Sequence, residues 1–380
     1  MKQTQARALN IDEDILGVVT FRKKILFKSR YVFFGNCLIG EKGYKATLTH
    51  SSSSYGNTPI VYAIPESFTL NDGDVVLITK EGLVTVLYDV KSSHNAILAT
   101  EKCNHRCIMC PQPPIVQEKD KTEFNLSLID LFDSSTKEVG ITGGEPTLIG
   151  DNLFVLIRHI QKRLPKAAVS ILSNGVKFAD KDYAKKLALC QHPDLQIDIP
   201  VFSDIAAEHN RIVGANTFYK TVKGLYNLAL FHVRIGIRVV VHRQTYKRLP
   251  QLADYIYHNF PFVSQVAFMQ METIGLAEEN IDKLWIDPFD YQEELREAVL
   301  LLRDRGIPSF IYNAQLCVIP DDIREYAVQS ISDWKDIYIE ECKDCVLKGM
   351  CAGFFESNRS HHSVHIKAQN KVIDKPICLT

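Results

Sequence analysis

Short apolar runs alternate with longer helical stretches over the middle of the chain, from about residue 95 to residue 313. The runs have the length and β-branched content of buried strands, and the stretches between them have apolar residues at helical spacing. We expect strands at 96–101, 138–142, 167–172, 195–201, 234–241 and 263–269. We expect helices near 123–134, 151–164, 179–189, 216–231, 249–259 and 289–304. This alternation predicts a parallel sheet with right-handed crossovers.

The first part of the chain has a different pattern, with short β-branched and aromatic runs bounded by turn residues. Tyr31–Phe34 and Ile60–Ile64 are two such runs, and Val75–Thr79 and Leu83–Tyr88 are expected to form a hairpin. Either a small barrel that packs on the next domain or a clamp that pairs a peptide with its strands fits this pattern. We therefore expect three parts: a small β-rich domain at 1–94, an α/β core at 95–313, and an extension at 314–380.

The composition narrows the range of functions and cellular locations that fit the chain. The 380 residues carry 44 basic and 45 acidic side chains, a net charge of -1, so nothing indicates a nucleic-acid partner. No apolar run is long enough to span a membrane, and the N-terminal residues lack the apolar core of a signal peptide. Ten cysteines in such a chain favour a reducing, cytoplasmic location and metal binding over disulfides.

Three cysteines follow the first expected strand of the core in a C-x3-C-x2-C spacing: Cys103, Cys107 and Cys110. Prolines directly after Cys110 prevent a helix from starting there, so the cysteines lie on a loop. Three thiolates close together suit an iron–sulfur cube with one iron left open for a ligand. A zinc loop, or three unrelated buried cysteines, is the alternative.

A Gly-Gly-Glu-Pro sequence, Gly143 to Pro146, follows the second expected strand. Gly143 and Gly144 allow a backbone to approach a ligand closely, Pro146 restricts the exit of the chain, and Glu145 can receive an ammonium group. In an α/β barrel the ligand lies at the carboxyl ends of the strands, where both motifs fall.

Together these two motifs resemble the radical S-adenosylmethionine (radical SAM) superfamily, although that family usually has an aromatic residue where this chain has Met109. The resemblance implies a (β/α)6 partial TIM barrel, a [4Fe-4S] cluster on the three cysteines, and SAM bound to the free iron. It also implies that the Gly-Gly-Glu-Pro motif holds the amino group of SAM. Further candidate SAM contacts at the strand ends are Ser173, Asn174, Pro200, Arg238, Met271 and Glu272.

Two of these candidates have structural alternatives. Ser173 and Asn174 are equally compatible with a turn that an Asx bond closes. Arg238 lies among apolar neighbours in the fifth strand, so it needs a partner, which is either the SAM carboxylate or a carboxylate of the protein.

The C-terminal extension contains a second group of cysteines: Cys317, Cys342, Cys345 and Cys351. Four thiolates suit either zinc or another iron–sulfur cluster. The run resembles the auxiliary-cluster extensions of the SPASM and twitch kind, which implies one auxiliary [4Fe-4S] cluster. Cys378 is a spare candidate ligand.

Most of the chain, including the stretch from Ser330 to Trp334, resembles the radical SAM maturase of the His-Xaa-Ser system. That resemblance implies modification of a ribosomally made precursor peptide, with an oxidative cross-link as the expected product. It also implies an external one-electron reductant of the flavodoxin or ferredoxin type and a second radical SAM maturase or small partner protein. An enzyme acting on a nucleoside or tRNA, and a cluster-binding partner without catalysis, are the alternatives.

Overall fold

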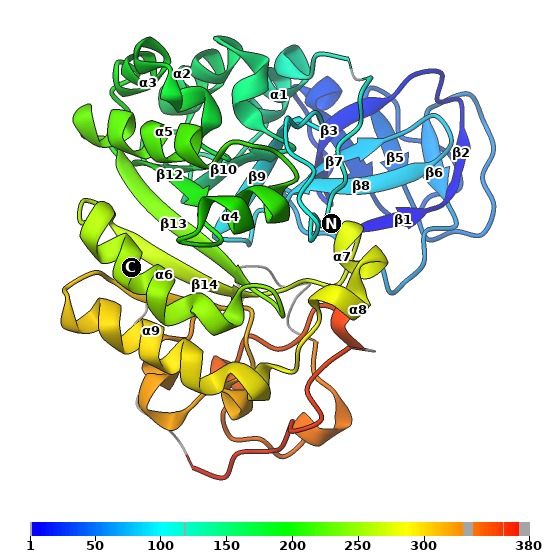
Figure 1. Cartoon of the computed structure of the whole chain (residues 1–380). Helices are drawn as coiled ribbons and strands as arrows, with labels where there is room; N and C mark the ends of the chain where they lie inside the picture. The colour runs from blue at the N-terminus through cyan, green and yellow to red at the C-terminus, as the bar shows by residue number, and fades with distance from the viewer. Residues whose placement is uncertain (1, 118, 330–336, 360, 372–380) are drawn as a thin grey trace. The chain divides into compact units, whose positions relative to one another are not determined.

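The computed structural model describes residues 2–117, 119–329, 337–359 and 361–371 (Figure 1). The stretch Ser330–Trp334 and Cys378 lie outside the described residues. Internal contacts group the chain into two compact units, one of residues 1–97, 121–139 and 158–167 and one of residues 98–120, 140–157 and 168–380. The expected boundaries near residues 94 and 313 stay a prediction.

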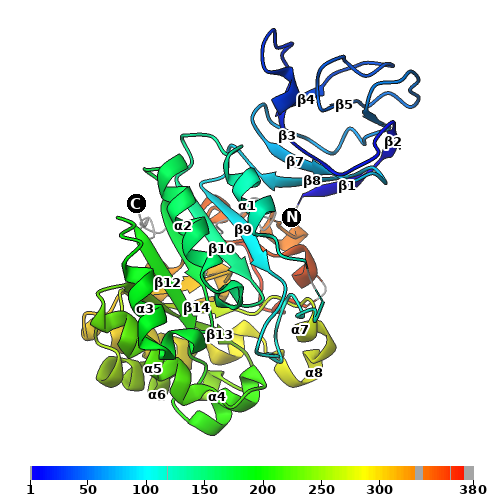
Figure 2. The ribbon, with the colours of Figure 1, turned by 90° about the horizontal axis from the view of Figure 1, so that it is seen from above.

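Eight strands form the sheet of the first unit. They are β1 (Gln3–Gln5), β2 (Arg7–Leu9), β3 (Ile15–Thr20), β4 (Tyr31–Phe34), β5 (Ala46–Leu48), β6 (Ile60–Tyr62), β7 (Val75–Ile78) and β8 (Leu83–Tyr88). Their order is β1-β8-β7-β3-β4-β5-β6-β2. The two end strands are consecutive in the chain and only Ala6 separates them, so the sheet closes into a small barrel (Figure 2).

The expected hairpin between β7 and β8 is confirmed. The two strands pair antiparallel, and the Gly82 N–H donates to the Thr79 carbonyl at 2.9 Å to close the turn. Gly82 has a φ of +87°, and a Cβ there would lie 2.5 Å from the Ala6 carbonyl oxygen. Glycine is therefore needed at this turn for its conformation and for the close approach of the β1–β2 run.

Seven strands form the second sheet, in simple chain order. They are β9 (His94–Thr100), β10 (Glu138–Gly143), β11 (Ala168–Leu172), β12 (Leu195–Pro200), β13 (Arg234–Val241), β14 (Gln265–Gln270) and β15 (Ser309–Tyr312). Strands β11 to β15 pair in parallel with their neighbours. The six expected strands are confirmed, and β15 is a seventh that the pattern did not predict.

The helices occupy the connections between these strands. They are α1 (Thr122–Ile129), α2 (Asn152–Arg163), α3 (Lys181–Ala188), α4 (Ala206–Val213), α5 (Phe218–Leu230), α6 (Leu249–Asn259), α7 (Leu276–Glu279), α8 (Ile281–Leu284) and α9 (Gln292–Asp304). Helices α3, α5 and α6 lie on the outer side of the sheet (Figure 2), and each buries a leucine or isoleucine completely or almost completely against it. The six expected helices are confirmed, whereas α4, α7 and α8 were not predicted.

Parallel strands with returning helices bring all strand carboxyl ends to one edge of the sheet. The fold is therefore the expected α/β partial barrel with a β-rich N-terminal part. Within the described residues, no helix has both the length and the apolar character needed to cross a membrane.

Candidate functional site

The loop after β9 carries Cys103, Cys107 and Cys110, and the end of α4 holds it in place. The Arg106 and Ile108 N–H groups donate to the carbonyls of Val213 and Ile212, both at 3.0 Å. Gly214, with a φ of +66°, follows α4, and a Cβ there would lie 2.7 Å from the Arg106 carbonyl oxygen. The loop is thus fixed by backbone bonds to a helix that sequence reasoning missed.

The three thiols of this loop are close enough to influence one another. Burial raises the pKa of Cys103 to about 11 and that of Cys107 to about 12, and the charge on Cys110 adds to both shifts. Near neutral pH such thiols stay protonated unless a strong positive charge such as that of iron lies beside them. The His105 N–H donates to the Cys103 sulfur at 3.4 Å, the kind of bond that tunes a cluster ligand. This donor set fits a cluster held by three cysteines.

Gly143 and Gly144 at the end of β10 pack directly against the chain that leads into the cysteine loop. The Gly144 N–H donates to the Thr100 carbonyl and the Glu145 N–H donates to the Lys102 carbonyl, both at 2.8 Å. A Cβ on either glycine would lie 2.3 Å from one of these carbonyl oxygens. The glycines are therefore required where two strand ends meet, whatever ligand they also approach.

Glu145 is only 1% exposed, and four protein donors surround its carboxylate. One oxygen accepts from the Thr147 N–H and hydroxyl and from the Ser173 hydroxyl at 2.8 Å, and the other accepts from the Asn174 N–H at 2.6 Å. Burial raises the pKa of Glu145, and these donors oppose the shift. Glu145 thus joins the end of β10 to the end of β11, and its contact with an ammonium group stays a prediction.

Asn174 connects this network to the cysteine loop. Its side-chain Nδ2 donates to Oδ1 of Asn104, which lies between Cys103 and Cys107, at 2.6 Å. Its Oδ1 accepts from the Val176 N–H at 3.0 Å, so the expected Asx-type turn is present as well. Pro146 is buried at the start of the turn Pro146–Ile149. The carboxyl ends of β9, β10 and β11 therefore form one hydrogen-bonded unit.

The comparisons with known proteins agree with this geometry. Residues 97–256 match the Radical SAM superfamily. This part of the chain is therefore similar to that superfamily. The match begins within β9 and ends in α6, so it contains both the cysteine loop and the Gly-Gly-Glu-Pro motif.

Two curated relatives share part of this core. A tungsten-containing aldehyde ferredoxin oxidoreductase cofactor-modifying protein of Pyrococcus furiosus is 30% identical over 172 residues, which are 41% of this chain and 46% of that protein. A GTP 3',8-cyclase of Desulforamulus reducens is 26% identical over 160 residues, which are 40% and 48% of the two chains. The chain matches about half the length of these relatives.

Solved structures show the same fold. A histidine-tagged anSMEcpe with bound AdoMet superposes with a TM-score of 0.52 at 17% identity, covering 72% of this chain and 91% of the other. Native anSMEcpe with bound AdoMet and Cp18Cys peptide gives 0.50 at 17% identity, with the same coverage.

Further along the sheet, Arg238 of β13 is half-buried among the strands. Its guanidinium donates to the Met269 sulfur at 3.4 and 3.3 Å, and it lies near Asp198 of β12. Burial lowers the pKa of Arg238, and the charge of Asp198 opposes that effect. Gly236 makes room for Asp198, because a Cβ on it would collide with that carboxylate. Pro200 lies opposite Arg238 in the β12–β13 register.

Met271, directly after β14, is 6% exposed and packs in one apolar cluster with Met109 and Cys107. It therefore lies beside the cysteine loop, as a SAM contact at the end of the sixth strand would require. Glu272 is half-buried in the same segment.

Electrostatic interactions link the four cysteines of the extension. The charge of Cys345 raises the pKa of Cys317, and the charge of Cys317 raises the pKa values of Cys342 and Cys351. Burial raises the pKa of Cys351 to about 11. Cys317 and Cys342 pack against the apolar cluster of Val318, Phe354 and Ile366. Across the described residues, no group of three or more His, Cys, Asp or Glu side chains forms a preformed site for a metal ion.

Sequence reasoning missed two polar residues of the cysteine loop, Asn104 and His105. The His105 Nε2 lies 2.9 Å from the Thr217 hydroxyl, and burial lowers the pKa of His105 to about 4. The imidazole is therefore neutral and ties the loop to the start of α5. Only their position in the sequence could have indicated a role for them, because both residues lie between the first two cysteines of the loop.

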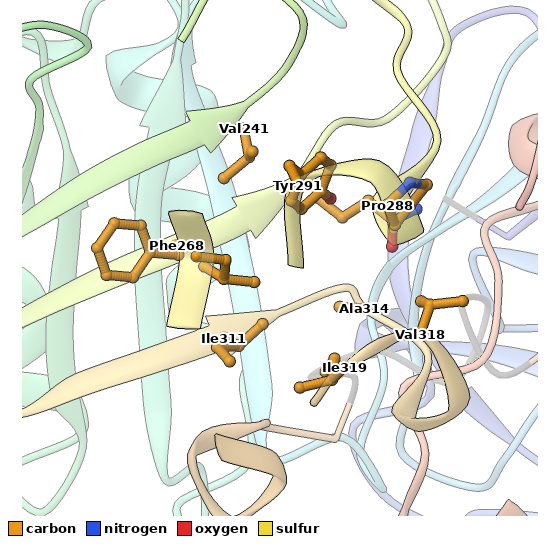
Figure 3. A pocket seen from close by; sticks show the side chains of 10 residues that line it. Val241, Phe268, Pro288, Tyr291, Ile311, Ala314, Val318 and Ile319 are labelled. Carbon is orange, nitrogen blue, oxygen red and sulfur yellow. The ribbon is translucent and has the colours of Figure 1, made fainter. Parts of the chain in front are cut away.

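A small apolar pocket lies at the carboxyl ends of β13, β14 and β15. Val241, Phe268, Tyr291, Ile311 and Ala314 are among its lining residues (Figure 3). The room inside it is about 10 Å³, which is at the lower limit for one water molecule. This pocket is too small for a nucleoside-sized cofactor. None of its lining residues belongs to the cysteine loop.

Proposed function

We propose that this chain is a radical SAM enzyme that modifies a ribosomally made peptide. The observation that carries the proposal is the joining of two motifs: the loop of Cys103, Cys107 and Cys110 is hydrogen-bonded through Asn104 to the Glu145 network. A reduced [4Fe-4S] cluster, when bound, supplies an electron that cleaves SAM to methionine and a 5'-deoxyadenosyl radical, which abstracts hydrogen from the substrate. The protein positions the reactants and excludes water.

The chain's own residues divide this work. Cys103, Cys107 and Cys110 hold the cluster, and the buried Glu145 keeps the ends of β10 and β11 in register beside it. Arg238 is a half-buried cation beside Asp198 that donates to a thioether, a weak acceptor, and we infer that it also receives a carboxylate of SAM. The remaining residues of the proposed cofactor site are Gly143, Gly144, Ser173, Asn174, Pro200, Met271 and Glu272.

A peptide substrate has two supports. The fold is similar to that of anSMEcpe with bound AdoMet and Cp18Cys peptide, and the sequence resembles His-Xaa-Ser maturases. We infer that the substrate has His-Xaa-Ser repeats, that an oxidative cross-link forms, and that the reaction takes place in the reducing cytoplasm. A flavodoxin or ferredoxin type of protein would supply the electron, and a second radical SAM maturase or small partner protein would act on the same peptide.

We further infer that Cys317, Cys342, Cys345 and Cys351 hold one auxiliary [4Fe-4S] cluster. A cross-link removes two hydrogens from the peptide. One leaves as the hydrogen atom that the 5'-deoxyadenosyl radical takes, and the other leaves as one electron and one proton. Zinc has no accessible second oxidation state and does not accept that electron. An iron–sulfur cluster would supply an acceptor for it, and Cys317, Cys342, Cys345 and Cys351 have the thiol ligands that would hold such a cluster.

The deciding experiment is anaerobic co-expression with a candidate His-Xaa-Ser precursor peptide, followed by mass spectrometry of the peptide. We expect a loss of two hydrogens for each cross-link, and 5'-deoxyadenosine from the purified protein with SAM and dithionite. If the chain forms no 5'-deoxyadenosine with any reductant, the proposed enzymatic activity is refuted. If it cleaves SAM but yields no modified peptide, only the proposed substrate is refuted.

A nucleotide substrate is the second candidate, because curated relatives of this chain are named GTP 3',8-cyclases. The near-neutral charge of the chain, -1, gives no support for a polyanion. Incubation with GTP, SAM and reductant tests it directly. Consumption of GTP coupled to 5'-deoxyadenosine would replace the peptide with a nucleotide as the substrate.

A further inference from the structure

A buried pair, Thr273 and Asn358, anchors the C-terminal extension to the segment that follows β14. The Asn358 Oδ1 accepts from the Thr273 N–H at 3.2 Å and from its hydroxyl at 3.0 Å, and the Asn358 Nδ2 donates to the Met271 carbonyl at 3.3 Å. The Thr273 hydroxyl also lies 2.9 Å from the Ser357 carbonyl. Thr273 is 4% exposed and Asn358 is 3% exposed, so these bonds are shielded from water.

The other side of the same segment contacts the cysteine loop. The Leu276 N–H donates to the carbonyl of Cys110 at 2.9 Å, and the Asn280 Nδ2 donates to the Ile108 carbonyl at 3.1 Å. Gly275, with a φ of +61°, is pressed against the loop, because a Cβ there would lie 2.7 Å from the carbonyl oxygens of Cys110 and Pro111. Cys110, the third cysteine of the loop, is thus held in place by contacts with residues 275 and 276.

Residues 271–280 are therefore enclosed between the cysteine loop and the C-terminal extension. Figure 1 shows the extension, in orange to red, passing beside α7 and α8. Asn358 follows Cys351 closely in the chain, and the Gly353 carbonyl between them accepts from the buried Gln315 at 2.7 Å. The backbone that carries the last auxiliary cysteine thus continues directly into the anchor.

We propose that Thr273 and Asn358 are positioning residues through which the C-terminal extension sets the geometry of the cysteine loop and of its SAM contact at Met271. This proposal rests on the proposed SAM site. The physical reason is that an amide side chain with buried donors and acceptors allows one arrangement only, since any shift leaves a polar group unpaired. The extension is then part of the SAM site as well as the holder of a second cluster.

The test uses the reconstituted full chain and the variants Thr273→Val and Thr273→Ser. Valine keeps the volume of threonine but removes the hydroxyl, whereas serine keeps the hydroxyl. Thr136→Val is the matched control, because Thr136 is a buried threonine that bonds Tyr88 at 2.9 Å in the other unit. The readouts are SAM affinity, hydrogen exchange of residues 103–111, and the electron paramagnetic resonance spectrum of the reduced loop cluster with and without SAM.

We expect Thr273→Val to weaken SAM binding about tenfold, the usual effect of losing a buried hydrogen bond, to speed exchange in residues 103–111, and to alter the SAM-induced spectral change. Thr273→Ser should behave like the wild-type chain, and Thr136→Val should leave all three readouts unchanged. Equal behaviour of Thr273→Val and Thr136→Val would overturn the proposal. A wild-type chain that binds no SAM would instead refute the proposed function, while hydrogen exchange would still report on the loop.

Asn358→Asp gives a second, independent variant. Aspartate keeps the acceptor for Thr273 but removes the donor to the Met271 carbonyl and buries a charge. We expect it to release the Met271 segment and to raise hydrogen exchange in residues 271–280 together with residues 103–111. Faster exchange confined to the C-terminal extension would overturn the coupling between the two regions.

Discussion

The Cα of Gly144 lies so close to Lys102 that a Cβ attached to it would come within 2.3 Å of the Lys102 carbonyl oxygen. Lys102 directly precedes the first cysteine of the loop. The Gly-Gly-Glu-Pro motif and the cysteine loop are therefore in backbone contact. A change at Gly144 must act on the cysteines as well as on any ligand that the motif binds.

This contact changes the expected effect of a substitution at Gly144. From the sequence alone, Gly144→Val would block SAM and spare the cluster. With Lys102 in contact, Gly144→Ala already forces backbone apart, which costs about 1–3 kcal/mol as overpacking does. We expect loss of loop-cluster iron together with loss of SAM binding, measured by iron analysis and by isothermal titration.

Gly349→Ala is the control, because a Cβ at Gly349 would meet no atom within 4 Å. It should keep iron and SAM affinity at wild-type levels. A Gly144→Ala chain with full iron content but no SAM binding would show that the motif contacts only the ligand.

Replacement of Cys103, Cys107 and Cys110 together by alanine should abolish 5'-deoxyadenosine formation. We expect it to remove about half of the iron while the far-ultraviolet circular dichroism stays unchanged, because these residues lie on a loop and outside the sheet. Iron content equal to that of the wild-type chain would show that these thiols are not ligands.

Metal analysis of anaerobically purified protein tests the extension. Two [4Fe-4S] clusters correspond to about eight irons per chain, with negligible zinc. The triple variant of Cys342, Cys345 and Cys351 should still form some 5'-deoxyadenosine but yield no modified peptide, because the product radical has no electron acceptor. About four irons and one zinc per chain would contradict the auxiliary cluster and leave the loop cluster intact.

Two buried histidines make stability depend on pH. Burial lowers the pKa of His242 to about 3 and that of His209 to about 4, whereas an unfolded histidine titrates near ~6.5. Below ~6.5 the unfolded state therefore binds more protons, and each histidine lowers the free energy of unfolding by up to about 1.4 kcal/mol per pH unit. The contribution of these histidines to the free energy of unfolding should be constant above pH ~7. It should fall as the pH drops towards ~4.5.

His242→Gln checks this prediction by urea unfolding at several pH values. Glutamine is neutral throughout, so the slope of the unfolding free energy against pH should decrease by about one proton between pH ~4.5 and ~6. An unchanged slope in this window would mean that His242 binds a proton in the folded chain.

The pattern of apolar residues was sufficient for the long elements. The run Tyr31–Phe34 is β4, residue for residue, and the strand expected at 234–241 is β13. Short elements escaped because their sequences lack a repeated period. Helices α7 and α8 are single turns, and β1 (Gln3–Gln5) is a polar strand that exists only because it pairs with β8. Such elements depend on the neighbours that complete their hydrogen bonds.

By itself, the sequence determined the chemistry of the site: three thiols on one loop, a Gly-Gly-Glu-Pro turn after the next strand, and four more thiols near the end. These are local features, since spacing and turn residues operate over a few positions. Only the tertiary structure decided which groups meet. Glu145 bonds Ser173 and Asn174, Asn174 bonds Asn104, and Asn358 bonds Thr273, because parallel strands bring their carboxyl ends to one edge and buried polar groups must find partners there.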